Sequence, residues 1–422
     1  MDNLFGVPAD TPLEVVAHKA GYDDAFVHLA ERLYRQQFPG AEVRHTGVND
    51  VPAALEPRFS AGDPPDLVSS SGLAMMDLGR LAREGQLTDL APLLESPSVD
   101  DPGKTVAQTL RPGTLEMTRF GGTCYAINYA YKVFDLFHAR SVFIEHGWEY
   151  PRTWDGMLEL CAEIKRAGIA PWTYAGDFLA PLFRVLLSMA TKLAGPQIVV
   201  DIDNLEPAAW RADAVVAAAE AMYELVRRDY ILPGSARMTY LEAQTQFVHG
   251  KAAFLPCGSW LEGEMRGITP AGFEMRLAPV PAIGTDNALP YEAIMAVAGE
   301  PFMVPTKAKN PNGGLHLLRL ITSRRVARKF TETTEEFSVV AGAADDLPAT
   351  GGFAAVRDVI ERAGDHTFTI GFHLRYRDLY RGLGKVTAQL MTGELTPREW
   401  SAGCQRESDR IARDESIVKY PR

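Results

Sequence analysis

The stretch 13–45, LEVVAHKAGYDDAFVHLAERLYRQQFPGAEVRH, decides the fold class. It begins with a short apolar run at 13–18, which predicts a buried strand. Apolar residues then recur at helical spacing from Phe26 to Leu33, which predicts an amphipathic helix. After a Phe-Pro-Gly turn, 41–45 predicts the next strand. The chain therefore opens with a strand, a helix and a strand.

The same alternation continues outward from this unit. We expect a helix over 52–60 and a short buried strand over 66–68, and 154–167 has the spacing of an amphipathic helix. A further α/β stretch covers 247–304, and a helical tail runs from 314 to the end. Strands that alternate with helices indicate an α/β fold with a mostly parallel sheet. No low-complexity linker interrupts the chain.

The composition argues against several classes of function. The chain has 422 residues, 54 acidic against 43 basic side chains, a net charge of −11 and 46% apolar residues. This is the composition of an ordinary globular protein, and its length suggests two or three domains. The acidic balance argues against a nucleic-acid binder and against docking on an anionic membrane. The sequence has no run of about 20 apolar residues, so we expect no membrane-spanning helix.

The motifs of common enzymes are absent. The sequence has no GxGxxG after a strand, no GxxxxGK[ST], no HExxH and no GxSxG, and no two histidines have metal-like spacing on one helix. Asp201 and Asp203 would suit a metal or a solvated turn. The four cysteines form no CxxC, so we expect buried free thiols, or otherwise one or two disulfides that close long loops.

Six short segments carry a family resemblance. They are DPPDLV at 63–68, GQLTDL at 85–90, GGTCYA at 121–126, PRTWD at 151–155, HGKAAF at 249–254 followed by GSW at 258–260, and VPTKAKNP at 304–311. In this order they resemble the sugar-binding, family 1 class of extracellular solute-binding proteins of ABC transporters. Four more segments, HGWEYP at 146–151, AGIAPWTY at 167–174, PCGSWLE at 256–262 and GEPF at 299–302, are similar to actinobacterial lipoproteins that bind N-acetylglucosamine or diacetylchitobiose.

The resemblance implies a type II periplasmic-binding-protein fold with two α/β lobes joined by hinge strands. We expect lobe 1 to comprise 1–129 plus 297–324, and lobe 2 to comprise 130–296 plus 325–422. The ligand would lie in the interlobe cleft, with hinge closure around it. The family also implies an extracellular, membrane-attached lipoprotein whose signal and anchor cysteine precede Met1. It would act as a monomer with permease subunits as partners, and without nucleic acid, cofactor, bound metal or catalytic residues.

A sugar offers apolar C–H faces and a rim of hydroxyl groups, so its site needs aromatic faces and planar polar side chains. Trp260 is the leading candidate for stacking on a sugar ring; the alternative is a core tryptophan. Asp24 and the serines are equally suited to cap helices, and Glu262 to lie on a solvated helix. The full set of expected ligand contacts is Tyr22, Asp24, Ser70, Ser71, Asn128, Tyr129, Tyr131, Trp172, Trp260, Glu262 and Glu300.

The favoured function is capture of an amino sugar, N-acetylglucosamine or a chitobiose-type ligand, and its delivery to a membrane permease without a catalytic step. One alternative is a carbohydrate-processing enzyme of the glycoside hydrolase kind. The other is a binder of a different neutral mono- or oligosaccharide such as galactose.

Overall fold

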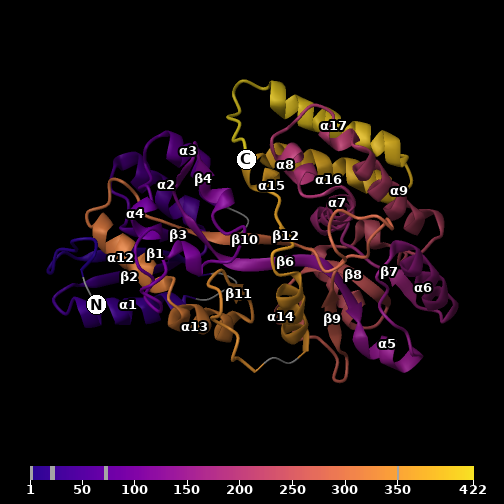
Figure 1. Cartoon of the computed structure of the whole chain (residues 1–422), viewed down its shortest axis with the longest axis horizontal. Helices are drawn as coiled ribbons and strands as arrows, with labels where there is room; N and C mark the ends of the chain where they lie inside the picture. Colours follow the sequence, from indigo (N-terminus) through magenta and orange to yellow (C-terminus); the bar gives the residue numbers. More distant parts are fainter. Residues whose placement is uncertain (1–2, 20–23, 71–74, 349–350) are drawn as a thin grey trace. The chain divides into compact units, whose positions relative to one another are not determined.

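A computed structural model describes residues 3–19, 24–70, 75–348 and 351–422. The chain divides into two compact units, Met1–Lys132 with Ala298–Pro348, and Val133–Val297 with Ala349–Arg422 (Figure 1). Below they are called unit 1 and unit 2. In the part of the chain that is described, no helix has both the length and the apolar character needed to cross a membrane.

Unit 1 is built on a mixed sheet. Strand β1 pairs in parallel with β2 and β3, β3 pairs antiparallel with β10, and β11 pairs antiparallel with the start of β6. The predicted strand–helix–strand opening is confirmed. The expectation of a mostly parallel sheet is met only in part, because β6 pairs antiparallel with β8, β9 and β11, and β10 pairs antiparallel with β3. The elements are β1 Leu13–His18, α1 Ala25–Gln37, β2 Val43–Val48, α2 Val51–Ala61, β3 Leu67–Ser69, α3 Leu78–Arg83, α4 Ala91–Leu94, β4 Arg119–Phe120, β5 Thr123–Cys124, β6 Ile127–Ala139, β10 Ile294–Met303, α12 Pro311–Ile321, α13 Arg324–Thr334 and β11 Phe337–Ser338.

Helices cover both faces of this sheet. In Figure 1, α2 and α3 lie on one side of β1 to β3, and α1 and α13 lie on the other. On the first side, Val16 and Val68 from the strands form a buried cluster with Leu55 of α2. On the second side, Phe26 of α1 packs edge-on against Phe330 of α13, with ring centroids 5.1 Å apart. Strands β1 and β3 are thus buried on both faces, as their apolar residues require, whereas the edge strand β2 is partly exposed.

Two of the quoted motifs meet at Asp66. Its carboxylate accepts hydrogen bonds from the backbone N–H of Glu14 and of Asn310, both at 2.7 Å. Asn310 in turn caps α12, because its side-chain oxygen accepts from the N–H of Gly313 at 2.9 Å. The two motifs are therefore linked in this fold, because one buried carboxylate ties β1 to the start of α12.

The chain passes between the units within β6, within β10 and after Pro348. The first two crossings lie close to the expected boundaries at 129/130 and 296/297. The third differs from the expected 324/325, since α13 and β11 belong to unit 1. The reason is packing: α13 lies on α1 through Phe330, and β11 continues the sheet beside Tyr131.

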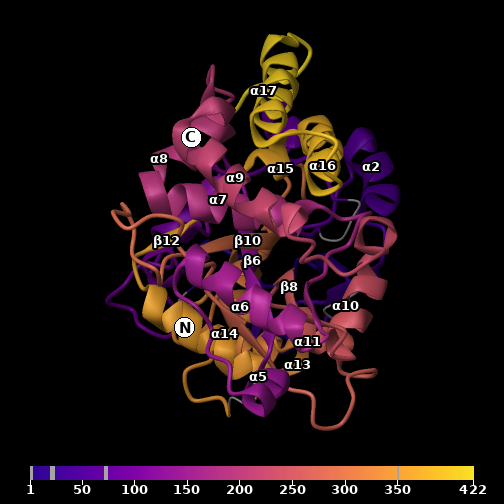
Figure 2. The same cartoon turned by 90° about the vertical axis from the view of Figure 1, so that its right-hand side faces the viewer.

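Unit 2 has a smaller sheet and most of the helices. The second half of β6 pairs antiparallel with β8 and β9, β8 pairs in parallel with β7, and the first half of β10 pairs in parallel with β12. Figure 2 shows α6 in front of this sheet and α16 and α17 in the helical layer above it. The elements are α5 Arg140–His146, α6 Trp154–Arg166, β7 Ala170–Trp172, α7 Ala180–Ala194, α8 Gln197–Asp203, α9 Asp213–Arg227, α10 Tyr240–Val248, β8 Ala252–Gly258, α11 Leu261–Met265, β9 Met275–Ala278, α14 Gly351–Ala363, β12 Thr367–Phe368, α15 Phe372–Arg375, α16 Arg377–Met391 and α17 Pro397–Arg413.

The four cysteines, all described, are buried free thiols. Asp201 and Asp203, for which a metal site or a solvated turn was considered, both lie at the end of α8. Asp203 is fully buried, and its carboxylate accepts from the N–H groups of Gly371 and Phe372 at 2.7–2.9 Å. It also pairs with the Arg422 guanidinium at 2.6 Å. Asp203 therefore fastens the C-terminal residue to the helical layer.

Replacement of Asp203 by Ala will destabilise unit 2 by about 3–5 kcal/mol, because it removes the acceptor of two buried N–H groups and the charge that pairs with the Arg422 guanidinium. Chemical denaturation followed by circular dichroism measures this loss. Asp201→Ala is the matched control, since Asp201 only holds an exposed hydrogen bond from Gln197 and its loss should change stability by about 0.5 kcal/mol or less. Equal stability of the two variants would contradict the assignment.

Candidate functional site

The Gly-Ser-Trp motif of unit 2 forms a rigid corner at the end of β8. Ser259 ties this corner to β6, because its N–H donates to the Val133 carbonyl at 2.9 Å and its hydroxyl accepts from the Val133 N–H at 3.3 Å. The Trp260 indole folds back over the α-carbon of Gly258, where a β-carbon would collide with three of its ring atoms. Glycine is therefore needed at 258 so that Trp260 can lie flat against the strand.

A chain of hydrogen bonds fixes the other end of the indole. The Trp260 Nε1–H donates to the Tyr240 hydroxyl, which donates to the Glu264 carboxylate at 2.9 Å. The Gln244 side chain donates to the same carboxylate oxygen at 2.9 Å. The indole also packs edge-on against Phe134, with centroids 5.1 Å apart. Trp260 is thus half-buried and held in one orientation, so part of it stays accessible to a ligand.

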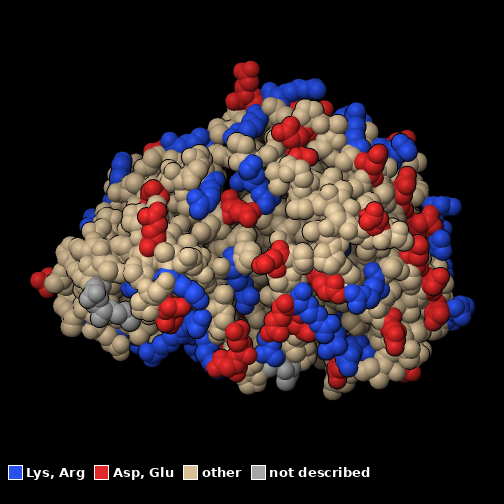
Figure 3. All heavy atoms as spheres, in the orientation of Figure 1, with Lys and Arg blue, Asp and Glu red and all other residues tan. Residues whose placement is uncertain are grey.

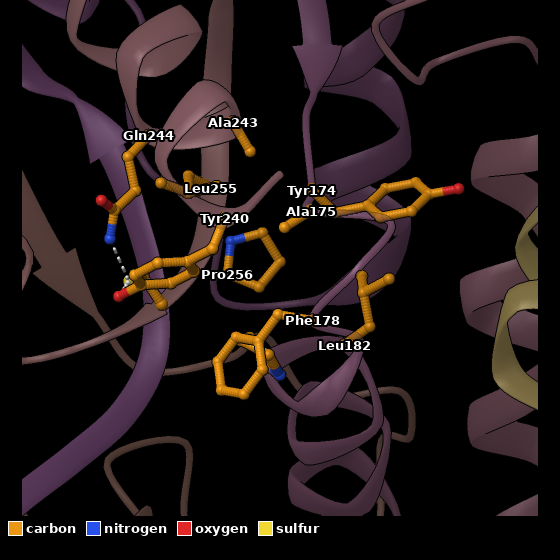
Figure 4. Close-up of a pocket in the computed structure, with 11 residues that line it drawn as sticks. Tyr174, Ala175, Phe178, Leu182, Tyr240, Ala243, Gln244, Leu255 and Pro256 are labelled. Atoms are coloured by element: carbon orange, nitrogen blue, oxygen red, sulfur yellow. Dashed lines mark hydrogen bonds between the residues drawn. The ribbon is translucent and has the colours of Figure 1, made fainter. Parts of the chain in front are cut away.

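A pocket lies beside this chain of hydrogen bonds. Its cavity volume is about 10 Å³, close to the minimum that holds one water molecule. In Figure 4 the rings of Tyr240 and Tyr174 lie on opposite sides of Pro256, with the Phe178 ring next to them. Phe178 meets Tyr240 edge-on at 5.3 Å. The pocket therefore offers aromatic surface rather than room for a whole sugar ring.

Burial keeps the groups of this pocket uncharged. Burial raises the pKa of the Tyr174 hydroxyl to about 12, and that of the Cys257 thiol to about 12. Nearby, Arg184 is fully buried, with its guanidinium 3.7 Å from the centroid of the Phe134 ring, and burial lowers its pKa to about 10. On the face shown in Figure 3, acidic and basic side chains are interspersed among the described residues.

Two of the expected ligand contacts in unit 2, Trp172 and Glu262, are engaged in holding the fold together. Trp172 is buried in the core, where it packs against Trp154 and Phe254. Its placement gives no support to the expectation that it touches a ligand. The Glu262 carboxylate accepts from the N–H of Phe353 at 2.8 Å, in the first turn of α14, where a negative charge is favourable. Glu262 is therefore engaged in holding a helix rather than lying on a solvated one.

In unit 1, three expected residues are largely enclosed. The Ser70 hydroxyl accepts from the Met76 N–H at 2.9 Å, and its own N–H donates to the Pro301 carbonyl at 3.0 Å. Tyr129 is fully buried and donates to the Ile321 carbonyl at 2.8 Å. Tyr131 is also buried, below the Arg111 guanidinium at 5.5 Å. Asn128 differs from them, because its buried side-chain nitrogen has no hydrogen-bond partner within the described residues.

Glu300 is the most unusual of the expected residues. Its φ of +62° is uncommon for a residue with a side chain, and its half-buried carboxylate pairs with the Lys132 ammonium at 2.8 Å. The other carboxylate oxygen is buried without a hydrogen-bond partner in the described part of the chain. Backbone strain of about 1–3 kcal/mol is typical of functional positions, which keeps Glu300 a candidate.

Tyr22 and Ser71 lie outside the described residues, and their expected roles stay predictions. Asp24 is buried at the start of α1, and its carboxylate lies 3.1 Å from the His45 ring nitrogen Nε2. The structure does not show its side chain capping the helix.

Sequence reasoning missed the residues that orient Trp260. Tyr240 and Gln244 are four residues apart on α10, and Trp260 and Glu264 are four residues apart at α11. Side chains at this spacing share one face of a helix. Two such pairs, each with a polar member beside an aromatic one, were the available signal, although only the fold brings the two faces together.

The sequence is similar to a known protein family and to a protein of known ligand. Residues 19–330 match the family model described as bacterial extracellular solute-binding protein. The diacetylchitobiose binding protein NgcE of Streptomyces coelicolor is 31% identical to the chain, over 99% of this chain and 88% of that protein.

Solved structures match the fold along nearly the whole chain. RafE of Streptococcus pneumoniae covers 96% of this chain and 99% of its own, with a TM-score of 0.77 at 17% identity. A chitin oligosaccharide binding protein covers 96% and 99%, with a TM-score of 0.71 at 18% identity. Together with the division into two α/β units, these matches confirm the expected two-lobed α/β fold.

Replacement of Gly258 by Ala will destabilise the protein by about 1–3 kcal/mol, because the new methyl group must displace the Trp260 indole. Neither Gly258 nor the control, Gly267, has a positive φ, so Ala strains neither backbone. Nothing lies within 4 Å of a β-carbon at Gly267, and Gly267→Ala should be nearly neutral. Thermal and denaturant unfolding measure both changes, and a neutral Gly258→Ala would disprove the packing role of the glycine.

Proposed function

Because the chain belongs to the family of bacterial extracellular solute-binding proteins, we propose that it captures an amino sugar of the chitobiose type for an ABC importer. The choice of sugar is supported by the 31% identity to a diacetylchitobiose binding protein over nearly the whole chain. The protein acts outside the cell, attached to the membrane, and passes the sugar to the permease subunits. This location and this partner are inferred from the family.

The observation that carries the proposal is the half-buried, immobilised indole of Trp260. An aromatic ring that is already fixed loses little conformational freedom when a ligand binds, so more of the contact energy appears as affinity. The backing by Gly258 and the bond to Tyr240 fix both ends of the indole. We propose that one sugar ring stacks on Trp260, beside the aromatic pocket formed by Tyr174, Phe178 and Tyr240.

Electrostatics favours a neutral ligand for this site. The one carboxylate in the hydrogen-bond chain, Glu264, already accepts from Tyr240 and Gln244. Arg184 is enclosed against Phe134. Recognition of an acidic or phosphorylated sugar calls for accessible cations, whereas hydroxyl and acetamido groups need only neutral donors and acceptors.

Unit 1 supplies further candidates. We propose that Glu300 accepts a hydrogen bond from the ligand and that Asn128 donates one, since each keeps a polar atom without a partner among the described residues. Trp172 and Tyr129 are left out of the proposed contacts, since both are enclosed in the core.

Isothermal titration calorimetry with N-acetylglucosamine, diacetylchitobiose, galactose and maltose tests the proposal. We expect the strongest binding with diacetylchitobiose. Trp260→Ala should weaken that binding by roughly 1–3 kcal/mol, about 5- to 150-fold in Kd, through the loss of buried aromatic surface. Trp148 is also half-buried in unit 2, but it stacks on His146, so Trp148→Ala is the matched control and should bind normally.

If calorimetry detects no heat of binding with any of the four sugars, the result would count against a sugar-binding role. Tight binding that Trp260→Ala leaves intact would remove Trp260 from the site while keeping the function. An aryl glycoside incubated with the protein should stay intact, and turnover that depends on a single carboxylate would instead support the enzyme alternative.

A further inference from the structure

Four titratable side chains of unit 1 meet where the start of α1 lies against β2. Asp24 immediately precedes α1, His28 and Glu31 lie on α1, and His45 lies on β2. The spacings of three, four and seven residues place Asp24, His28 and Glu31 on one face of the helix. None of the four has a part in the proposed binding at Trp260.

The cluster is buried on one side and open on the other. The side chain of Glu31 is 1% exposed, that of Asp24 8% and that of His45 11%, whereas that of His28 is 42% exposed. Burying two carboxylates so close together is costly unless cations or hydrogen-bond donors compensate for it. The compensation comes from two imidazole rings with centroids 4.1 Å apart.

Glu31 orients both rings. One of its oxygens lies 2.5 Å from Nδ1 of His45 and the other 3.0 Å from Nδ1 of His28. An ionised carboxylate only accepts hydrogen bonds, so each ring must carry a hydrogen on Nδ1. In a neutral ring this leaves the lone pair on Nε2, the atom that can bind a metal.

Both Nε2 atoms face the same third group. They lie 3.1 Å and 3.6 Å from the two oxygens of Asp24, for His45 and His28 respectively. The ligand atoms of Asp24, His28 and His45 all lie within 4.8 Å of one another. Around zinc, with bonds of about 2.0–2.1 Å, neighbouring tetrahedral ligands are about 3.3 Å apart. A small rotation of the exposed His28 would complete that geometry.

The backbone makes room for this arrangement. On β2, two residues after His45, Gly47 lies so close to Asp24 that a β-carbon there would be 2.7 Å from the Asp24 carboxylate. Two carboxylates, those of Asp24 and Glu31, face the imidazole of His45 at its two nitrogen atoms. The cluster therefore has the negative charge that would compensate a bound cation.

We propose that Asp24, His28 and His45 bind a divalent transition-metal cation such as Zn²⁺, with Glu31 orienting both imidazoles from behind. Three protein ligands leave one tetrahedral position for water on the exposed side. A carboxylate that accepts the second N–H of a metal-binding histidine is the usual support of such sites. The cation would fasten the start of α1 to β2, independently of the sugar.

Zinc titration of the chelator-treated, full-length protein tests this. We expect one Zn²⁺ per chain by equilibrium dialysis with elemental analysis, a higher Tm in its presence, and a much weaker effect of Mg²⁺ or Ca²⁺, which prefer oxygen ligands. His28→Gln should lower zinc affinity at least about tenfold and remove the shift in Tm, since the loss of even a supporting residue costs 10- to 100-fold. His28 is partly exposed, so this variant should still fold.

His249→Gln is the matched control, because His249 is an exposed histidine at the end of α10 in unit 2. It should leave zinc binding unchanged, whereas Glu31→Gln should weaken it. The absence of stoichiometric zinc binding would overturn the proposal, as would full binding by His28→Gln. Sugar calorimetry with and without zinc keeps the two proposals separate, since either can fail while the other holds.

Discussion

Both units depend on the backbone hydrogen bonds of two long strands, β6 and β10. The start of β6 pairs with β11 through Ala130 and Tyr131, and its second half pairs with β8 from Phe134 to His138. In the same way β10 pairs with β12 at one end and with β3 at the other. Each unit therefore needs strand segments that the chain supplies on its way to the other unit, which explains why the sequence contains no linker. A strand partner in each half also leaves few backbone groups of these buried strands without a hydrogen bond.

The candidate site in unit 2 follows from the same framework. Since β8 pairs with β6 up to Gly258, the next two residues must leave the strand at a fixed point. Ser259 closes the pairing through Val133, and Trp260 then folds over the last glycine. The chain from Trp260 through Tyr240 to Glu264 adds a polar constraint to this packing. An indole fixed by backbone pairing, by a missing β-carbon and by hydrogen bonds is preorganised, which is the property that the proposed stacking of a sugar on Trp260 needs.

Much of the fold could be predicted because it is encoded locally. The apolar run at 13–18 and the helical spacing of 154–167 depend on neighbours in the chain, and both agree with β1 and α6. The prediction for Trp260 came from a resemblance of short motifs. What could not be predicted depends on contacts between distant residues. Nothing local distinguishes Trp172 in the core from Trp260 at a corner, and nothing local brings His45 to His28. The third crossing was misplaced for the same reason, since only the contact of α13 with α1 assigns that helix to unit 1.

The backbone strain at Glu300 in unit 1 can be compared with the stability that its side chain contributes. Its positive φ costs about 1–3 kcal/mol, which a glycine at 300 would avoid. The residues after it are fixed, because Phe302 and Met303 pair with β3 and the Pro301 carbonyl accepts from Ser70. A glycine would keep this pairing but lose the carboxylate that meets Lys132. This ion pair is mostly buried, with side chains 20% and 12% exposed, and the cost of taking the two charges out of water cancels much of their attraction, which leaves little to offset the strain. Stability alone therefore does not account for a glutamate at this point in β10, which supports the proposal that its carboxylate accepts a ligand hydroxyl.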